Sequence, residues 1–76
     1  MEVNIYPNPS RGKLFICGTE QGTELSVCNR GGEEIHRSLP LNTHSIIDLT
    51  AQPEGVYYME FRSAWKVHLR KIVLEK

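Results

Sequence analysis

The sequence predicts an all-β protein, a sandwich built from seven short strands. Stretches rich in Val, Ile, Leu, Tyr and Phe recur along the chain, and within them apolar residues alternate with polar ones. Turn-forming residues separate these stretches at about 8–12 residues, a spacing typical of a β-sandwich. No segment keeps an apolar stripe at helical spacing, and Pro or Gly interrupts every window long enough to hold a helix.

The seven strands are expected at 3–6, 13–17, 23–29, 33–37, 44–49, 55–62 and 65–74. Three of the connections have turn chemistry that explains them. The PNPSRG segment at 7–12 contains prolines that fix φ and ends in a glycine that tolerates positive φ. The NRGG segment at 29–32 suits a hairpin turn, and the QPEG segment at 52–55 has the pattern of a type I turn.

The second and third expected strands each carry one apolar face, and pairing them as a hairpin joins the two faces. The pairs would be Leu14 with Val27 and Ile16 with Leu25. A sandwich could instead place these two strands in opposite sheets, since the alternation of side chains is the same in both arrangements.

The chain has two cysteines, Cys17 and Cys28, which are too few for a zinc site made of cysteine alone. In the hairpin register Cys17 faces Glu24 and Cys28 faces Lys13, so the thiols lie roughly 13 Å apart at strand rise. Such a distance is beyond the reach of a disulfide. Both cysteines are therefore expected to be free and unreactive.

The last two strands carry the bulkiest core candidates: Tyr57, Met59 and Phe61 on one face of the first, and Trp65, Val67 and Leu69 with a common parity in the second. Further along the final strand the apolar parity changes, to Ile72 and Leu74. A β-bulge near 70–71 would account for the change, because one extra residue reverses the direction of every following side chain.

Length and charge narrow the classes of function. A chain of 76 residues with 39% hydrophobic residues supports one domain with a thin core, without a deep substrate cavity. Nine basic residues balance nine acidic ones, so the basic excess typical of nucleic-acid binding is absent. Basic side chains do gather near the C-terminal end, where they are interpreted as one exposed strand face: Arg62, Lys66, Arg70, Lys71 and Lys76.

No apolar run approaches the length that spans a bilayer, and the first residues do not have the pattern of a signal peptide. The chain is therefore expected to be either cytosolic or a fragment of an exported protein whose signal lies upstream.

Candidate chemical sites are weak, and no catalytic residue, cofactor or metal is expected. The histidines His36, His44 and His68 lack the spacing of metal ligands. A nucleophile pair of Cys28 with His36 has no orienting third group, and an Asp48–Glu54 carboxylate pair is better explained by a strand end and a turn. Gly31-Gly32 lacks the remainder of a phosphate loop. Exposed tyrosines and the single Trp65 could form a platform for sugar binding, although alternating aromatics are more typical of a core.

Four elements, in order, resemble the C-terminal sorting domain of the Por-type, or type IX, secretion system. The family opens with a YPNP motif, a glycine and an alternating strand, and here residues 6–16 are YPNPSRGKLFI. Segment 24–29, followed by Gly32 and Ile35, is similar to its strand, turn and strand pattern. Residues 47–50 (IDLT) with 54–58 (EGVYY) resemble its next element, and 70–73 (RKIV) its basic C-terminal strand. Departures are Cys28, Asn29 and Arg70, where an aromatic residue, Asp and Lys are more usual.

The resemblance implies a seven-stranded, immunoglobulin-like antiparallel β-sandwich spanning 1–76, a single C-terminal domain of a larger secreted protein from a bacterium of the Bacteroidetes. It implies a monomer without enzymatic activity, cofactor, nucleic-acid partner or membrane insertion. The expected partners are the type IX machinery, a sortase-like peptidase that often removes the domain, and an N-terminal cargo domain. The cargo would pass through the periplasm and become secreted or attached to the cell surface.

By the same resemblance, the recognition residues would be Tyr6, Pro7, Asn8, Pro9, Gly12, Gly32, Asp48, Gly55, Tyr57, Arg70 and Lys71. A small sandwich also leaves edge strands, so a partner could extend the basic final strand through its unpaired backbone groups. The alternative is an accessory carbohydrate-binding or spacer module of a secreted hydrolase or adhesin. A carbohydrate-binding module would need exposed aromatics on one flat face, whereas sorting would need an accessible C-terminal strand.

Overall fold

Seven antiparallel strands form two sheets that face each other in the computed structural model, which describes residues 3–20, 22–38, 44–64 and 66–76. The strands are β1 (Asn4–Tyr6), β2 (Lys13–Cys17), β3 (Glu24–Asn29), β4 (Glu34–Ser38), β5 (His44–Asp48), β6 (Gly55–Arg62) and β7 (Val67–Leu74). The described part of the chain contains no helix long and apolar enough to cross a membrane. The predicted all-β class is confirmed, and the predicted strand positions agree to within two residues at each end.

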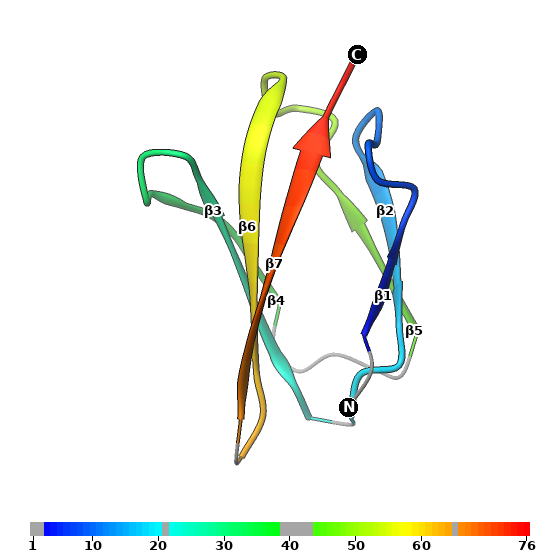
Figure 1. The fold of residues 1–76 in the computed structure, drawn as a ribbon, viewed down its shortest axis with the longest axis vertical. Coiled ribbons are helices and arrows are strands. Elements are labelled where there is room, and N and C mark those ends of the chain that lie inside the picture. Colours follow the sequence, from blue (N-terminus) through cyan, green and yellow to red (C-terminus); the bar gives the residue numbers. More distant parts are fainter. Residues whose placement is uncertain (1–2, 21, 39–43, 65) are drawn as a thin grey trace.

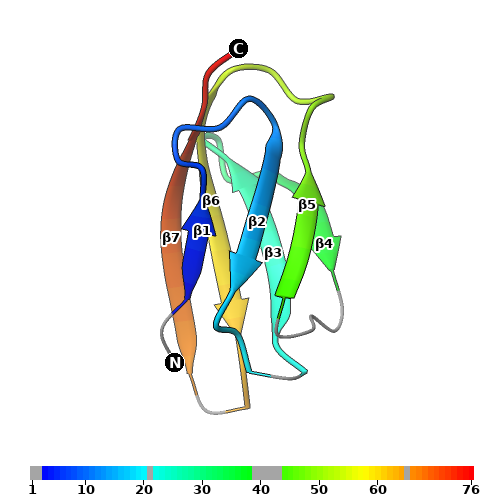
Figure 2. The ribbon, with the colours of Figure 1, turned by 90° about the vertical axis from the view of Figure 1, so that its right-hand side faces the viewer.

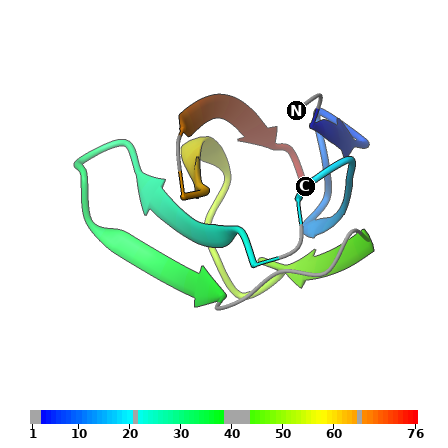
Figure 3. The same cartoon turned by 90° about the horizontal axis from the view of Figure 1, so that it is seen from below.

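One sheet has the order β1-β2-β5 and the other β4-β3-β6-β7 (Figures 1 and 2). Seen from below, the two sheets curve around a common interior (Figure 3). This is an immunoglobulin-like sandwich in which the fourth strand lies beside the third. A further feature of such folds is present: the Tyr57 hydroxyl, near the start of β6, donates a 2.6 Å hydrogen bond to the carbonyl of Pro53 in the preceding turn.

The interior is made by every second residue of the strands, as the alternating pattern requires. The buried apolar side chains are Val3, Leu14, Ile16, Leu25, Val27, Ile47, Leu49, Tyr57, Met59, Phe61, Ile72 and Leu74. Burial of one large side chain of this kind stabilises the fold by about 1.5–3 kcal/mol. The predicted core face of β6, made by Tyr57, Met59 and Phe61, is confirmed.

The predicted hairpin between β2 and β3 is wrong. β2 pairs with β1 and β5, whereas β3 pairs with β4 and β6. Leu14 lies beside Ile47 and Val27 beside Met59. Alternation alone could not separate the two arrangements, because apolar faces can meet side by side in one sheet or face to face across a core.

Cys17 and Cys28 are both free, as predicted, but the reason differs from the one expected. They belong to strands in opposite sheets, and each alternates with buried residues of its strand, so each lies on the outer side of its own sheet. The half-buried thiols therefore point away from one another.

The predicted bulge near 70–71 is also wrong. The register between β6 and β7 runs without a shift from Gly55 opposite Leu74 to Arg62 opposite Val67. In consequence Val67 and Leu69, expected in the core, lie on the outer face with 55% and 63% of their surface exposed. Trp65, the third residue of that expected group, lies outside the described residues.

The lengths of the strands explain this change of apolar face. β6 and β7 each have eight residues, whereas β1, β2 and β5 have three, five and five. In Figure 1 the first half of β7 reaches below β1. Only its second half, with Ile72 and Leu74, is therefore covered by the opposite sheet, and apolar residues are needed on the inner face only there.

Candidate functional site

Most residues of the sorting resemblance gather at one end of the sandwich, where β1, β3, β5 and β7 finish (Figure 1, top). We call this end, comprising the loops 7–12, 30–33 and 49–54 with residues 75–76, the motif end. At or beside it lie Tyr6, Pro7, Asn8, Pro9, Gly12, Gly32, Asp48, Gly55 and Tyr57. Arg70 and Lys71 lie on β7, further from this end.

The first loop of the motif end covers part of the free edge of β7. The Asn8 side chain donates from Nδ2 to the Lys71 carbonyl at 3.2 Å, and its Oδ1 accepts from the Val73 N–H at 3.1 Å. The Ser10 N–H donates to the Val73 carbonyl at 2.9 Å, and the Ser10 carbonyl accepts from the Glu75 N–H at 2.8 Å. The first and last motifs of the sequence are thus in direct contact, through hydrogen bonds that satisfy otherwise unpaired edge groups.

Ser10 and Gly12 give this loop its shape. The buried Ser10 hydroxyl donates to the Lys13 carbonyl at 2.6 Å and accepts from the Gly12 N–H at 3.0 Å. Gly12 has a φ of +142°, and a Cβ there would stand 2.5 Å from Thr50 Cγ2 and 2.8 Å from Thr50 Cα. Glycine therefore allows the first loop to lie directly on the loop after β5. Ser10 was missed by the sequence reasoning, although a serine between Pro and a turn glycine is a known signal for a side-chain-bonded turn.

Asp48 shapes the loop that follows β5. Its Oδ1 accepts hydrogen bonds from the Thr50 hydroxyl at 2.6 Å and from the Thr50 N–H at 2.9 Å. The hydroxyl bond, then the N–H bond, and to a smaller degree the charge of Lys13 hold the pKa of Asp48 below its ordinary value of 3.8. Glu54, its suggested partner for sugar hydrolysis, instead accepts from the Lys76 N–H at 2.6 Å. Both carboxylates thus have a structural role.

The remaining motif residues of this end support turns. Tyr57 is buried, and its hydroxyl holds the turn before β6 through Pro53. Gly55 and Gly32 have φ values of +148° and +87°, in the region that favours glycine. These three positions stabilise the shape of the motif end rather than offering side chains to a partner.

The last residue of the chain is held by the same end. The Lys76 ammonium donates to the Thr50 carbonyl at 2.6 Å and also to the Gln52 carbonyl. Together with the contacts of Asn8 and Ser10, these bonds fix the second half of β7 and the residues after it to the rest of the sandwich.

Arg70 and Lys71 are the predicted recognition residues that present positive charge to solvent. Both are exposed, and Arg70 makes a long hydrogen bond, 3.4 Å, to the neighbouring carbonyl of Leu69. With Asn4 and Ile5 of β1 they line a shallow cleft between β1 and β7. In the described ranges no carboxylate forms an ion pair with Lys66, Arg70 or Lys71. All three side chains are exposed.

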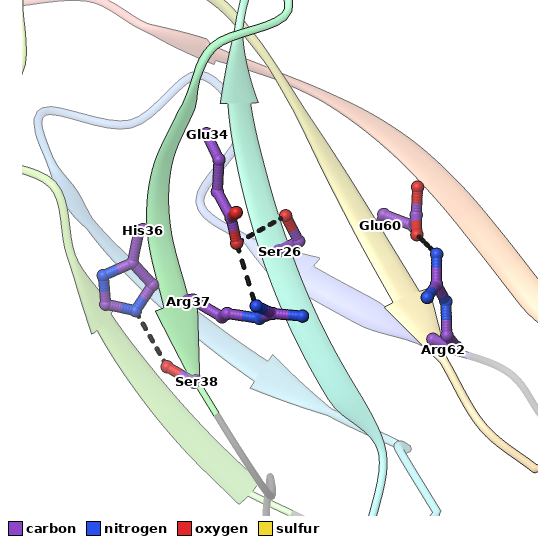
Figure 4. Close-up of polar contacts among 7 residues, drawn as sticks. All are labelled: Ser26, Glu34, His36, Arg37, Ser38, Glu60 and Arg62. Carbon is purple, nitrogen blue, oxygen red and sulfur yellow. Dashed lines mark hydrogen bonds and ion pairs between the residues drawn. The ribbon is translucent and has the colours of Figure 1, made fainter.

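The outer face of the larger sheet carries charges that pair among themselves (Figure 4). Glu34 Oε1 lies 3.6 Å from Arg37 Nε and accepts from the Ser26 hydroxyl at 3.1 Å, whereas Arg62 and Glu60 form a 2.6 Å pair. On the other face of β4, His36 Nε2 is bonded to the Ser38 hydroxyl at 2.8 Å. Among residues 3–20, 22–38, 44–64 and 66–76 no group of three or more metal-ligating side chains occurs.

Two exposed aromatic residues, Tyr6 and Phe15, lie side by side on the outer face of the smaller sheet, 51% and 40% exposed. Their ring centroids are 5.6 Å apart and the rings are inclined by 19°, so they stack on one another. Stacked rings cover part of each other's faces and do not present both in one plane. Tyr58, which is also exposed, belongs to the other sheet. The described aromatics thus do not form the flat platform that a carbohydrate-binding module needs.

The fold and this end together define a β-sandwich module whose terminal strand is integrated into the domain. Residues 4–75 match the family model described as the secretion system C-terminal sorting domain. The chain belongs to this family, which consists of secretion signals and not of catalysts. The sorting resemblance inferred from the sequence is confirmed.

A solved structure with a similar fold is PorZ, an essential bacterial surface component of the type IX secretion system of Porphyromonas gingivalis. The TM-score is 0.80 at 18% sequence identity, and the match covers 97% of this chain but 11% of PorZ. This likeness shows the fold. The comparison with curated proteins yields no match.

Proposed function

We propose that this chain is the C-terminal signal that directs a larger cargo protein across the outer membrane through a type IX secretion system. The cargo would cross the periplasm, and a sortase-like peptidase would then remove the domain as the cargo reaches the surface or the medium. The observation that carries the proposal is the family match over nearly the whole chain, combined with a fold that unites the first and last motifs.

The arrangement of the strands supports this function. β1 begins at the end of the sandwich opposite to the motif end, whereas β7 finishes at the motif end (Figure 1). A cargo domain attached before β1 would therefore leave from the far end. The motif end would then stay uncovered while the cargo is attached.

A secretion assay tests the proposal. The chain is fused behind a signal peptide and a fluorescent reporter, and expressed in a bacterium with a type IX system. We expect reporter on the surface or in the medium. Reporter that stays in the periplasm, while the domain is folded, would contradict the proposal.

Point variants are better suited to this assay than a truncation of residues 70–76. That truncation would remove the buried Ile72 and Leu74, and it would unfold the domain rather than test recognition. The double variant Arg70→Ala with Lys71→Ala removes exposed charge only, and we expect reduced export. The matched control is Arg37→Ala, an exposed arginine on β4 at the opposite edge of the same sheet, which we expect to export normally.

The structure does not favour the alternative of an accessory carbohydrate-binding module, because the exposed Tyr6 and Phe15 stack on each other. Affinity electrophoresis in gels containing soluble polysaccharides provides the check. Retarded migration that Tyr6→Ala abolishes would favour the carbohydrate-binding alternative over the sorting function.

A further inference from the structure

One half of the final strand has an edge that no described segment covers. β7 is the last strand of its sheet, and hydrogen bonds from Asn8 and Ser10 cover its free side at Lys71 and beyond. In an antiparallel ladder every second residue directs both backbone groups to the same side. Since Val73 directs its N–H and carbonyl to the free edge, Val67 and Leu69 do the same. No described segment pairs with these two residues on that side, and the Leu69 carbonyl accepts only the long, 3.4 Å hydrogen bond from the neighbouring Arg70 side chain. We call residues 67–70 the open edge.

The side chains of the open edge have different chemistry on the two faces of the sheet. Val67 and Leu69 form an exposed apolar outer face, and Leu69 is among the most exposed large apolar residues of the described chain. His68 and Arg70 point to the inner face, opposite Phe61 and Met59 of β6. Proteins usually protect an edge with charge, proline or a bulge, so an apolar pair on an unpaired edge is a feature of a docking site.

The charge around the open edge indicates what would bind there. Lys66 precedes it and Lys71 follows it, Arg70 lies within it, and no described carboxylate pairs with these three cations. The nearest acid across the strand pair, Glu60 opposite Leu69, is already paired with Arg62 at 2.6 Å. The open edge therefore has an uncompensated positive charge.

We propose that the open edge binds an extended segment of another protein by strand addition, and that this segment alternates apolar with acidic residues. Neighbouring side chains on paired strands share a face. The apolar residues of the partner would thus lie beside Val67 and Leu69, and its carboxylates beside Arg70. A second copy of this chain would bring cations against cations and is disfavoured. The inference rests on the proposed function in one respect, since the partner would belong to the secretion machinery.

A short synthetic peptide of alternating Val and Glu is the probe, and one of alternating Val and Lys is its control. Amide chemical shifts of the labelled domain report the position of binding. We expect shifts centred on Val67 and Leu69, and affinity for the acidic peptide about tenfold or more above that for the basic one, decreasing with salt. Equal binding of both peptides, shifts centred on β4, or dimerisation without peptide would overturn the inference.

Two variants test the geometry. Leu69→Pro removes an N–H that points to the open edge and leaves the bonds between β6 and β7 in place, because an edge strand tolerates proline there. We expect loss of peptide binding. Arg70→Glu keeps every backbone group, and we expect it to reverse the preference between the two peptides. An unchanged preference would overturn the proposed orientation even if Leu69→Pro failed to fold.

The reporter assay separates this inference from the proposed function. If the unaltered domain exports the reporter and folded Leu69→Pro exports it equally well, the open edge has no part in sorting and the inference fails alone. If the unaltered, folded domain leaves the reporter in the periplasm, the proposed function fails, whatever the peptides show. Export that Leu69→Pro reduces in parallel with peptide binding would support both.

Discussion

Replacement of Gly12 by alanine is expected to destabilise the fold more than the same replacement at a glycine whose added Cβ would meet no other atom. Two terms add at this position. A residue with a Cβ at a φ of +142° is strained by about 1–3 kcal/mol. The Cβ would also stand 2.5 Å from Thr50 Cγ2 and 2.8 Å from Thr50 Cα, and overpacking of this kind costs about 1–3 kcal/mol more.

The matched control is Gly55→Ala, because Gly55 has nearly the same backbone angle, φ +148°, with no atom within 4 Å of the added Cβ. Gly55→Ala should therefore lose only the free energy that comes from backbone strain. Urea unfolding followed by circular dichroism measures both variants, with the difference between them giving the contact term. We expect Gly12→Ala to lose about 2–6 kcal/mol in total, a large part of the roughly 5–15 kcal/mol typical of a folded domain.

A second substitution tests the source of the contact. Thr50→Ser removes Cγ2 and keeps the hydroxyl that binds Asp48, so it should recover part of the stability lost in Gly12→Ala. Equal losses in Gly12→Ala and Gly55→Ala would refute the conclusion that the first loop is packed tightly on the loop after β5.

Three further outcomes are expected at the motif end. Tyr57→Phe should lower the free energy of unfolding by about 1 kcal/mol, because the bond to the Pro53 carbonyl is lost; an unchanged urea midpoint would show that this bond adds nothing. The lowered pKa of Asp48 stabilises the folded state above pH 3.8, and this stabilisation is lost as the pH falls through the folded pKa. The difference in unfolding free energy between wild type and Asp48→Asn should therefore shrink in acid. A difference that does not change with pH would contradict this. Asn8→Ala should accelerate amide hydrogen exchange at Val73, and an unchanged exchange rate would mean that Asn8 does not protect this edge.

The motif residues inferred from the resemblance have two kinds of role in the structure. Gly12, Gly55 and Tyr57 are required for the conformation of the motif end. Arg70 and Lys71 are exposed on β7 without a partner carboxylate in the part of the chain that is described. A motif read in a sequence contains both kinds without distinction, since a residue that shapes a loop and a residue that contacts a partner can recur at equally regular positions.

The sequence alone determined the class of fold, the positions of the seven strands, the core face of β6 and the family. All of these depend on short-range information. Alternation of apolar residues marks a strand, Gly and Pro mark its ends, and a family motif is a run of neighbouring residues.

Only the tertiary structure decided which strands pair, which half of β7 is covered, and that Asn8 meets Lys71 and Val73. The inner and outer faces of a strand alternate identically whether its neighbour lies beside it or across the core, so the pattern could not exclude the β2–β3 hairpin. Likewise, the change of apolar face along β7 follows from the short strands of the opposite sheet, which cover only part of a longer strand.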